Sequence, residues 1–250
     1  MDKMPTKLLR SITSGALIRT PSFLRVLGWT VAFQFLYILL NFTLNAQTEH
    51  PLTGRKIAPV MGVGGADWLE RPEREMEESP DQMLDALNLK KGQRVADVGA
   101  GVGYLTLRIA RRVGPAGEVY GVDIQKEMLE RLRKNAEKAK LDNIETVLGT
   151  ENDPKLPAGG VDLILMVDVY HELSQPQAML QHMKTALSRE GRLVLVEYRK
   201  EDPSVPIRIE HKMSAWEVKT EVEAEGYLLD KTVKTLPRQN VFIFRVAKPN

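Results

Sequence analysis

Short apolar runs alternate with stretches of helical periodicity through the middle of the chain. The apolar runs, which have the length and aliphatic content of β-strands, are residues 94–98, 118–122, 144–148, 161–167 and 191–198. Helical spacing is found over residues 104–114 and 126–140, and in a later segment that Ser174 is expected to cap. Strands that alternate with helices of this length predict right-handed βαβ units, and so an α/β fold with a doubly wound, mostly parallel sheet.

The pattern changes near the C-terminus. Residues 213–226 predict a helix that Gly226 ends, and two further strands follow at 227–236 and 241–247. The four residues between these strands cannot hold a crossover helix, so the strands should form an antiparallel hairpin at the C-terminal edge of a seven-stranded sheet. Upstream, residues 69–89 predict two helical pieces that meet at Ser79 and Pro80.

A long uncharged run precedes the region of alternating elements. Residues 1–25 carry five basic side chains against Asp2 alone, and the 23 residues 26–48 have no charge. As a helix this run would reach ~34 Å, enough to cross a membrane. It is interpreted either as an uncleaved anchor or as a signal peptide cut after Ala46, and the basic flank favours a cytoplasmic N-terminus.

These features divide the chain into four predicted regions. They are a basic region (1–25), a transmembrane or signal segment (26–48), an irregular leader rich in Gly and Pro (49–69) and the α/β domain (70–250). The whole chain has a net charge of +2 and its first 25 residues have +4, so the rest has no basic excess and a nucleic-acid partner is not expected. The absence of cysteine excludes thiolate chemistry, and the four widely spaced histidines do not predict a metal site.

A glycine-rich turn with the sequence DVGAGVGY occupies residues 97–104. Gly99, Gly101 and Gly103 follow a predicted strand and precede a predicted helix, where glycine allows close approach of a ligand to the backbone. Asp123 ends the next strand, where a carboxylate can accept hydrogen bonds from both ribose hydroxyls. The spacing G-x-G-x-G differs from the dinucleotide pattern G-x-G-x-x-G. Asp97 would also repel a pyrophosphate, so the turn favours a cationic adenosine cofactor.

In these motifs the chain resembles the class I S-adenosylmethionine-dependent methyltransferases, and in particular their small-molecule branch, which includes enzymes of quinone biosynthesis. The resemblance covers roughly residues 70–250 and is carried by VADVGAGVGYLT, VYGVDI, VLGTENDPKLP and VDLILMVDVYHEL in that order. It implies a Rossmann-like methyltransferase fold and S-adenosylmethionine as the cofactor.

The resemblance also implies which residues contact the cofactor. Asp97 and the glycine turn would contact the methionine part, Asp123 the ribose, and Glu151 or Asn152 the adenine. The full set of cofactor contacts that it implies is Asp97, Gly99, Ala100, Gly101, Gly103, Tyr104, Asp123, Ile124, Glu151, Asn152 and Asp168.

The segment DVYHEL, at the end of the central strand, supplies the candidate catalytic residues. His171 could act as a general base, Asp168 could hold the acceptor or the cofactor amine, and Tyr170 could line the pocket. In the alternative interpretation Tyr170 packs in the core and His171 makes a structural hydrogen bond. Met61 and Trp68 of the leader would form a lid over the cofactor or pack against the sheet edge.

Methyl transfer to a small-molecule acceptor, with a lipid-like compound as one candidate, is therefore the predicted function. Two alternatives stay open. One is a nicotinamide-dependent oxidoreductase on the same sheet, against which Asp97 and the glycine spacing count. The other is a membrane-tethered module that binds the cofactor without turnover, because an exported domain would leave the compartment where the methyl donor is expected to be made. The sequence leaves the side of the membrane and the oligomeric state open.

Overall fold

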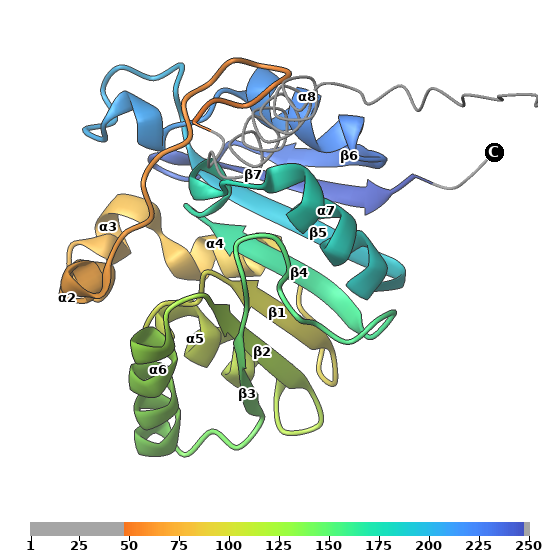
Figure 1. The fold of residues 1–250 in the computed structure, drawn as a ribbon. Coiled ribbons are helices and arrows are strands. Elements are labelled where there is room, and N and C mark those ends of the chain that lie inside the picture. Colours follow the sequence, from red (N-terminus) through yellow and green to blue (C-terminus); the bar gives the residue numbers. More distant parts are fainter. Residues whose placement is uncertain (1–47, 248–250) are drawn as a thin grey trace, which may run out of the picture. The chain divides into compact units, whose positions relative to one another are not determined.

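A seven-stranded sheet forms the centre of residues 48–247, the part of the chain that the computed structural model describes (Figure 1). Its strands are β1 (Arg94–Val98), β2 (Glu118–Asp123), β3 (Ile144–Leu148), β4 (Val161–Val167), β5 (Leu187–Tyr198), β6 (Tyr227–Val233) and β7 (Gln239–Val246). The order across the sheet is β3-β2-β1-β4-β5-β7-β6. Strands β1 to β5 are parallel, and β7 is antiparallel to both β5 and β6. The predicted α/β fold with its C-terminal hairpin is confirmed.

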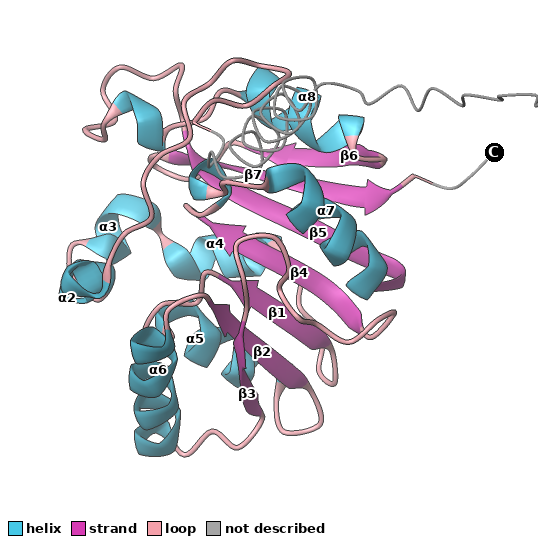
Figure 2. Cartoon of the chain, viewed as in Figure 1, coloured by secondary structure: helices cyan, strands magenta, loops and turns pink. Residues whose placement is uncertain are grey.

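Helices cover both faces of this sheet (Figure 2). The α-helices are α2 (Ala66–Leu69), α3 (Arg74–Glu78), α4 (Pro80–Ala86), α5 (Tyr104–Val113), α6 (Lys126–Ala139), α7 (Pro176–Ala186) and α8 (Ala215–Ala224). Helices α4, α5 and α6 pack on one face, and α7 and α8 pack on the other. Between β3 and β4 the chain crosses as a loop, residues 149–160, without a helix.

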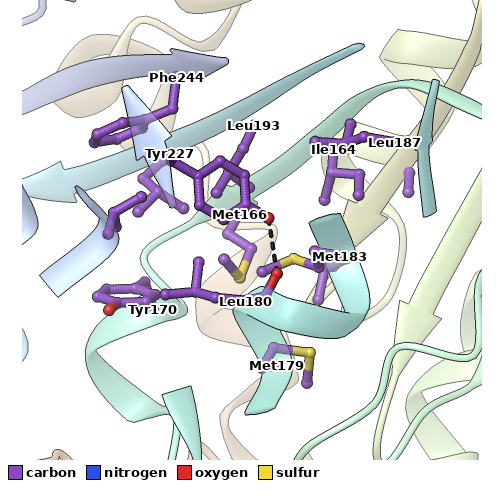
Figure 3. Close-up of a cluster of buried hydrophobic side chains, with 14 of the residues drawn as sticks. Ile164, Met166, Tyr170, Met179, Leu180, Met183, Leu187, Leu193, Tyr227 and Phe244 are labelled. Carbon is purple, nitrogen blue, oxygen red and sulfur yellow. Dashed lines mark hydrogen bonds between the residues drawn. The ribbon is translucent and has the colours of Figure 1, made fainter. Parts of the chain in front are cut away.

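The central strand β4 explains why both faces need cover. Leu163 and Leu165 pack with α4 and α5, whereas Ile164 and Met166 pack with α7 and α8. A strand buried on both sides has no polar alternation, which is why its sequence is almost continuously apolar. Figure 3 shows the second cluster, in which the Tyr227 hydroxyl donates a 2.8 Å hydrogen bond to the carbonyl oxygen of Leu180.

Two helix starts illustrate how local sequence sets the boundaries. Helix α8 begins with a capping box, in which Ser214 and Glu217 bond each other's backbone N–H groups. The expected cap of α7 by Ser174 is wrong, because that helix begins at Pro176, whose ring fixes a helical φ and which has no N–H to satisfy. Ser174 donates instead to Glu151, at 2.9 Å.

The leader, residues 48–69, is tied to the domain by a buried arginine. The Arg55 Nε lies 2.9 Å from Glu221 Oε1 on α8, and Arg55 Nη1 donates to the carbonyl oxygen of His171 at 3.1 Å. Both charged side chains are almost fully buried. The predicted domain boundaries stay predictions, but the described leader packs as a part of the same core.

No helix among residues 48–247 is long and apolar enough to cross a membrane. The apolar run predicted to form a membrane or signal segment, residues 26–48, lies outside the described residues except for Thr48.

The Arg55–Glu221 pair generates a stability prediction. Glu221→Ala would leave a buried guanidinium without its carboxylate, and we expect the free energy of unfolding to fall by about 3–5 kcal/mol. Lys219→Ala is the matched control, because Lys219 lies on the same helix, is exposed, and pairs only loosely with Glu223 at 4.0 Å. Urea unfolding of both variants would measure the difference, and equal small losses would contradict the role given to Glu221.

Candidate functional site

A cavity lies at the carboxyl ends of the parallel strands, where the chain turns away from β1, β2, β3 and β4. Among the residues that line it are Gly99, Gly101, Asp123, Ile124, Gln125, Gly149, Thr150, Glu151, Asp168 and Val169. These are the strand ends at which ligands bind in open parallel sheets, next to the point where strand order reverses between β1 and β4. The segments that follow β1, β2, β3 and β4, which carry most of the predicted cofactor contacts, therefore converge on one site.

The glycine turn owes its sequence to crowding as much as to a ligand. Gly99 has a φ of +79°, and a Cβ atom there would lie 2.3 Å from Val169 Cγ2. Gly103 has a φ of +93° and caps α5, and a Cβ atom there would lie 2.8 Å from side-chain atoms of Leu107 and Leu132. Larger residues at these two positions would displace the turn from the cavity wall.

Asp123 links the glycine turn to the end of β2. Its carboxylate accepts one hydrogen bond from the Gly101 N–H and one from the Gln125 N–H, each at 2.9 Å. Burial raises the pKa of this carboxyl, and the two backbone N–H groups oppose the shift. Asp123 is thus fixed by two elements at the wall of the cavity, as a ribose-binding acid would need to be.

Asp97 is buried at the end of β1, next to α5. Its side chain accepts a 2.6 Å hydrogen bond from the Thr106 hydroxyl of α5 and is not among the residues that line the cavity. Burial raises the pKa of the Asp97 carboxyl to about 6, although Thr106 and Arg74 lower it. Its contact with the methionine part of a cofactor stays a prediction.

Asp168 enters the cavity wall in a strained conformation. It follows β4 with a φ of +54°, which non-glycine residues rarely adopt. Gln239 Nε2 donates to its Oδ2 at 2.7 Å, while its Oδ1 has no hydrogen-bond partner among the described residues. Burial, together with the neighbouring Glu78 and Glu197 carboxylates, raises the Asp168 pKa well above its ordinary value. Backbone strain at a cavity is typical of functional positions.

Most of the charged side chains in the largely apolar cavity wall are acidic. Asp123, Glu151, Asp168 and Glu172 line it, and Arg74 is the one basic residue among its described lining. Burial raises the pKa of Glu172 to about 7. The wall is therefore suited to a ligand that carries positive charge.

The other predicted site residues occupy three kinds of position. Ile124 and Glu151 line the cavity, whereas Asn152 accepts a hydrogen bond from Thr150 beside it. Ala100 is buried in the turn, where its N–H donates to the Val122 carbonyl oxygen. Tyr104 points to α3, where its hydroxyl donates to Glu75 at 2.6 Å.

The two aromatic residues of DVYHEL are buried behind the cavity. Tyr170 is fully buried in the core cluster (Figure 3). The Arg55 guanidinium carbon lies 5.4 Å from the centroid of its ring. His171 contacts Glu197 through Nδ1 at 2.6 Å and His211 through Nε2 at 3.1 Å. Neither residue lines the cavity. The catalytic roles of Tyr170 and His171 stay predictions. The position of Tyr170 in the core agrees with the alternative interpretation, in which it packs there.

The leader closes part of the cavity. Val60, Met61, Trp68 and Leu69 line it, and the Gln125 side chain donates to the Met61 carbonyl oxygen at 2.9 Å. The Trp68 ring is held by the Arg71 guanidinium, which lies 3.6 Å from the ring centroid. Met61 and Trp68 thus lie where the lid interpretation puts them.

Sequence reasoning missed two charged residues of the cavity wall. Glu172 lies next to His171 in the sequence but was considered only as part of the DVYHEL segment, and Arg74 lies in the predicted helical pieces of residues 69–89, to which no site role was given. The burial of Glu172 and Arg74 could not be predicted from the local sequence pattern, because it depends on how α3 and the leader fold over the edge of the sheet.

Comparisons with known proteins agree with this geometry. A family model described as "Methyltransferase domain" matches residues 89–236. A solved S-adenosylmethionine-dependent methyltransferase from Aquifex aeolicus is 28% identical, with a TM-score of 0.71 over 75% of this chain and 100% of that one.

Curated relatives match over shorter stretches. The ubiquinone/menaquinone biosynthesis C-methyltransferase UbiE of Yersinia enterocolitica is 30% identical over 47% of this chain and 47% of its own length. A demethylmenaquinone methyltransferase from a Geobacillus species is 26% identical over 47% of this chain and 50% of its own length. The matches thus span about half the length of these curated relatives.

The burial of Asp97 generates a pH-dependent prediction. A carboxyl whose pKa is about 6 in the folded protein and 3.8 unfolded stabilises the fold at low pH, and this stability is lost as the pH rises through about 6. Asp97→Asn cannot ionise. The unfolding free energy of the wild type, relative to this variant, should therefore fall by up to about 3 kcal/mol between pH 4 and pH 8.

Urea unfolding at several pH values would measure this difference. Asp142→Asn, an exposed change of the same kind, should leave the difference from wild type independent of pH. A flat difference for Asp97→Asn as well would contradict the pKa given to Asp97.

Proposed function

The chain belongs to the methyltransferase domain family, and we propose on this premise that it transfers the methyl group of S-adenosylmethionine to a small-molecule acceptor. The observation that carries the proposal is the cavity itself, where a glycine turn, the doubly hydrogen-bonded Asp123 and an acidic wall meet at the strand ends. This arrangement fits a ligand with a ribose and positive charge.

The residues present fit each part of such a cofactor. Asp123 would bind the ribose hydroxyls, Ile124 would pack against the adenosine, and Glu151 would lie beside the adenine. Asp168 would meet the positively charged part of the methionine. Arg74 is the lining side chain suited to the methionine carboxylate, since it is the one guanidinium of the described wall.

The cofactor, when bound, would supply an activated methyl group on a sulfonium sulfur for transfer to the acceptor. The protein's own contribution is to align the acceptor with the methyl group and to exclude water, which can lower a barrier by ~7–11 kcal/mol. Met61 and Trp68 would exclude water from the leader side. Asp168 would hold the acceptor or the cofactor amine.

A small acceptor is supported by the relatives and by the enclosure of the site. Two of the relatives are named for quinone biosynthesis, and the acceptor side of this cavity is bounded by the leader and by the segment after β4. No finding supports the alternatives of an oxidoreductase or of a binding module without turnover.

Thermal unfolding of the full chain with four separate ligands tests the cofactor. S-adenosylmethionine and S-adenosylhomocysteine should raise the melting temperature, since a ligand at 100 times its Kd stabilises the native state by about 2.7 kcal/mol. NAD and NADP should not. Selective stabilisation by NAD would contradict the proposal.

Removal of the Asp123 charge tests the ribose contact. Asp123→Asn should weaken S-adenosylmethionine binding by about 10- to 100-fold, because a neutral amide replaces a charged acceptor of hydrogen bonds. Calorimetric titration would measure this change, with the exposed Asp142→Asn as a control that should bind like the wild type. Equal affinities in all three proteins would exclude Asp123 from the site.

We also propose that residues 26–48 attach the chain to a membrane or direct its export, because their uncharged run is long enough to cross one. On cell fractionation the full chain should pellet with membranes and resist extraction with carbonate. A chain that begins at residue 49 should be released. Recovery of the full chain in the soluble fraction would contradict attachment.

A further inference from the structure

Two histidines that are far apart in the sequence meet at the back of the cavity. His171 and Glu172 lie on the short helix η2 (Tyr170–Glu172), and His211 ends the short helix η3 (Ile209–His211). The His171 Nε2 lies 3.1 Å from His211 Nδ1 and 3.9 Å from Glu172 Oε1. The His211 Nδ1 lies 4.0 Å from the same Glu172 oxygen.

These three atoms form a triangle of the size that metal ligands form. A point in its plane can lie about 2.2 Å from all three atoms at once, close to the ~2.0–2.2 Å bonds of zinc to imidazole nitrogen and carboxylate oxygen. The two imidazole planes are almost perpendicular, at 86°.

A buried carboxylate orients the first of these ligands. Glu197 Oε2 lies 2.6 Å from His171 Nδ1, and the Glu197 side chain is fully buried. When Nδ1 donates to this carboxylate, Nε2 carries the lone pair that a metal ion would need. Metal-bound histidines are usually held by such a carboxylate. Arg55 and the Ala58 N–H also bond the His171 carbonyl oxygen, which fixes η2 in place.

The two glutamates of this cluster would be stabilised by a bound cation. Glu172 and Glu197 are both largely shielded from water, and among the described residues neither forms an ion pair with a lysine or an arginine. Glu197 Oε1 has no hydrogen-bond partner in this part of the chain. Buried carboxylates are normally paired or coordinate a metal, because an uncompensated buried charge is costly.

We propose that His171 Nε2, His211 Nδ1 and a Glu172 carboxylate oxygen bind a divalent transition-metal ion of the zinc class. Two nitrogens and one carboxylate oxygen suit such an ion, and three protein ligands leave a coordination position open. This proposal reverses the expectation from the sequence, in which the histidines were too widely spaced for a metal site.

The open position would serve the acceptor. Glu172 lines the same cavity as Asp168, so an ion bound to Glu172 would lie close to that cavity. An acceptor with a metal-binding oxygen, such as a phenol or an enol, would be held there next to the methyl donor. This use of the ion rests on the proposed function, whereas binding of the ion does not.

Calorimetric titration of the untagged, chelator-treated full chain with Zn²⁺ tests the site without any methyl donor. One equivalent should bind with a Kd below about 1 μM, equivalent to about −8 kcal/mol. His211→Ala should weaken binding by at least about 100-fold, and Glu197→Gln by about 10- to 100-fold through the lost orientation of His171. His211 is partly exposed, so its variant is the safer one for folding.

His182→Ala is the matched control, since His182 is half-exposed, lies on α7 and contacts the backbone of Asn152 and Ala178. It should bind Zn²⁺ like the wild type. Co²⁺ should give a visible absorption band that His211→Ala loses and His182→Ala keeps. The absence of stoichiometric binding, or equal losses in both histidine variants, would overturn the proposal. Binding of S-adenosylmethionine to the metal-free chain is measured separately, so either idea can fail alone.

Discussion

The parallel pairing of β1 with β4 is the constraint on which the cavity depends. Strands β2 and β3 are added on one side of this pair and β5 on the other, so the segments that leave β1 and β4 turn in opposite directions and leave a crevice between them. The two segments still touch at its floor, where Gly99 lies against Val169 so closely that a Cβ atom would not fit. The glycine turn is therefore needed to let the strands pair as well as to admit a ligand.

The cover of this crevice comes from an unusual source. No helix intervenes between β3 and β4 in the described chain. The leader instead covers part of the cavity, and it contacts α8 and η2 through Arg55 and Gln125 through the Met61 carbonyl oxygen. The leader is attached to the domain by the Arg55 guanidinium. The free-energy cost of removing this group from water is offset by its hydrogen bonds to Glu221 and to the His171 carbonyl oxygen. Arg55 thus joins α8, the leader and the histidine cluster. A movement of the leader would therefore change both the cavity wall at Met61 and the position of His171.

The sequence could predict those features that depend on local pattern. The strands, the glycine turn and Asp123 at the end of β2 were found because periodicity and turn chemistry act over a few residues. The contact between His171 and His211 could not be found, because their separation of 40 residues is closed only by the course of the chain after β5. The hydrogen bond between Thr106 and Asp97 could not be found either, because it depends on how α5 packs on β1, and the predicted contact of Asp97 with a cofactor stays a prediction.

Asp123 and Asp168 are the acids at the strand ends that line the cavity and could attract a cationic cofactor. Burial raises the pKa of both carboxyls, because the low-polarity surroundings destabilise the charged form of each acid in the free protein. A bound positive charge would reduce that destabilisation, whereas a pyrophosphate would increase it. The destabilisation of the charged form should fall most at Asp168 Oδ1, because this oxygen accepts no hydrogen bond from the described residues. We therefore expect the discrimination between a cationic cofactor and a pyrophosphate to arise from the acids at the ends of β2 and β4, on either side of β1.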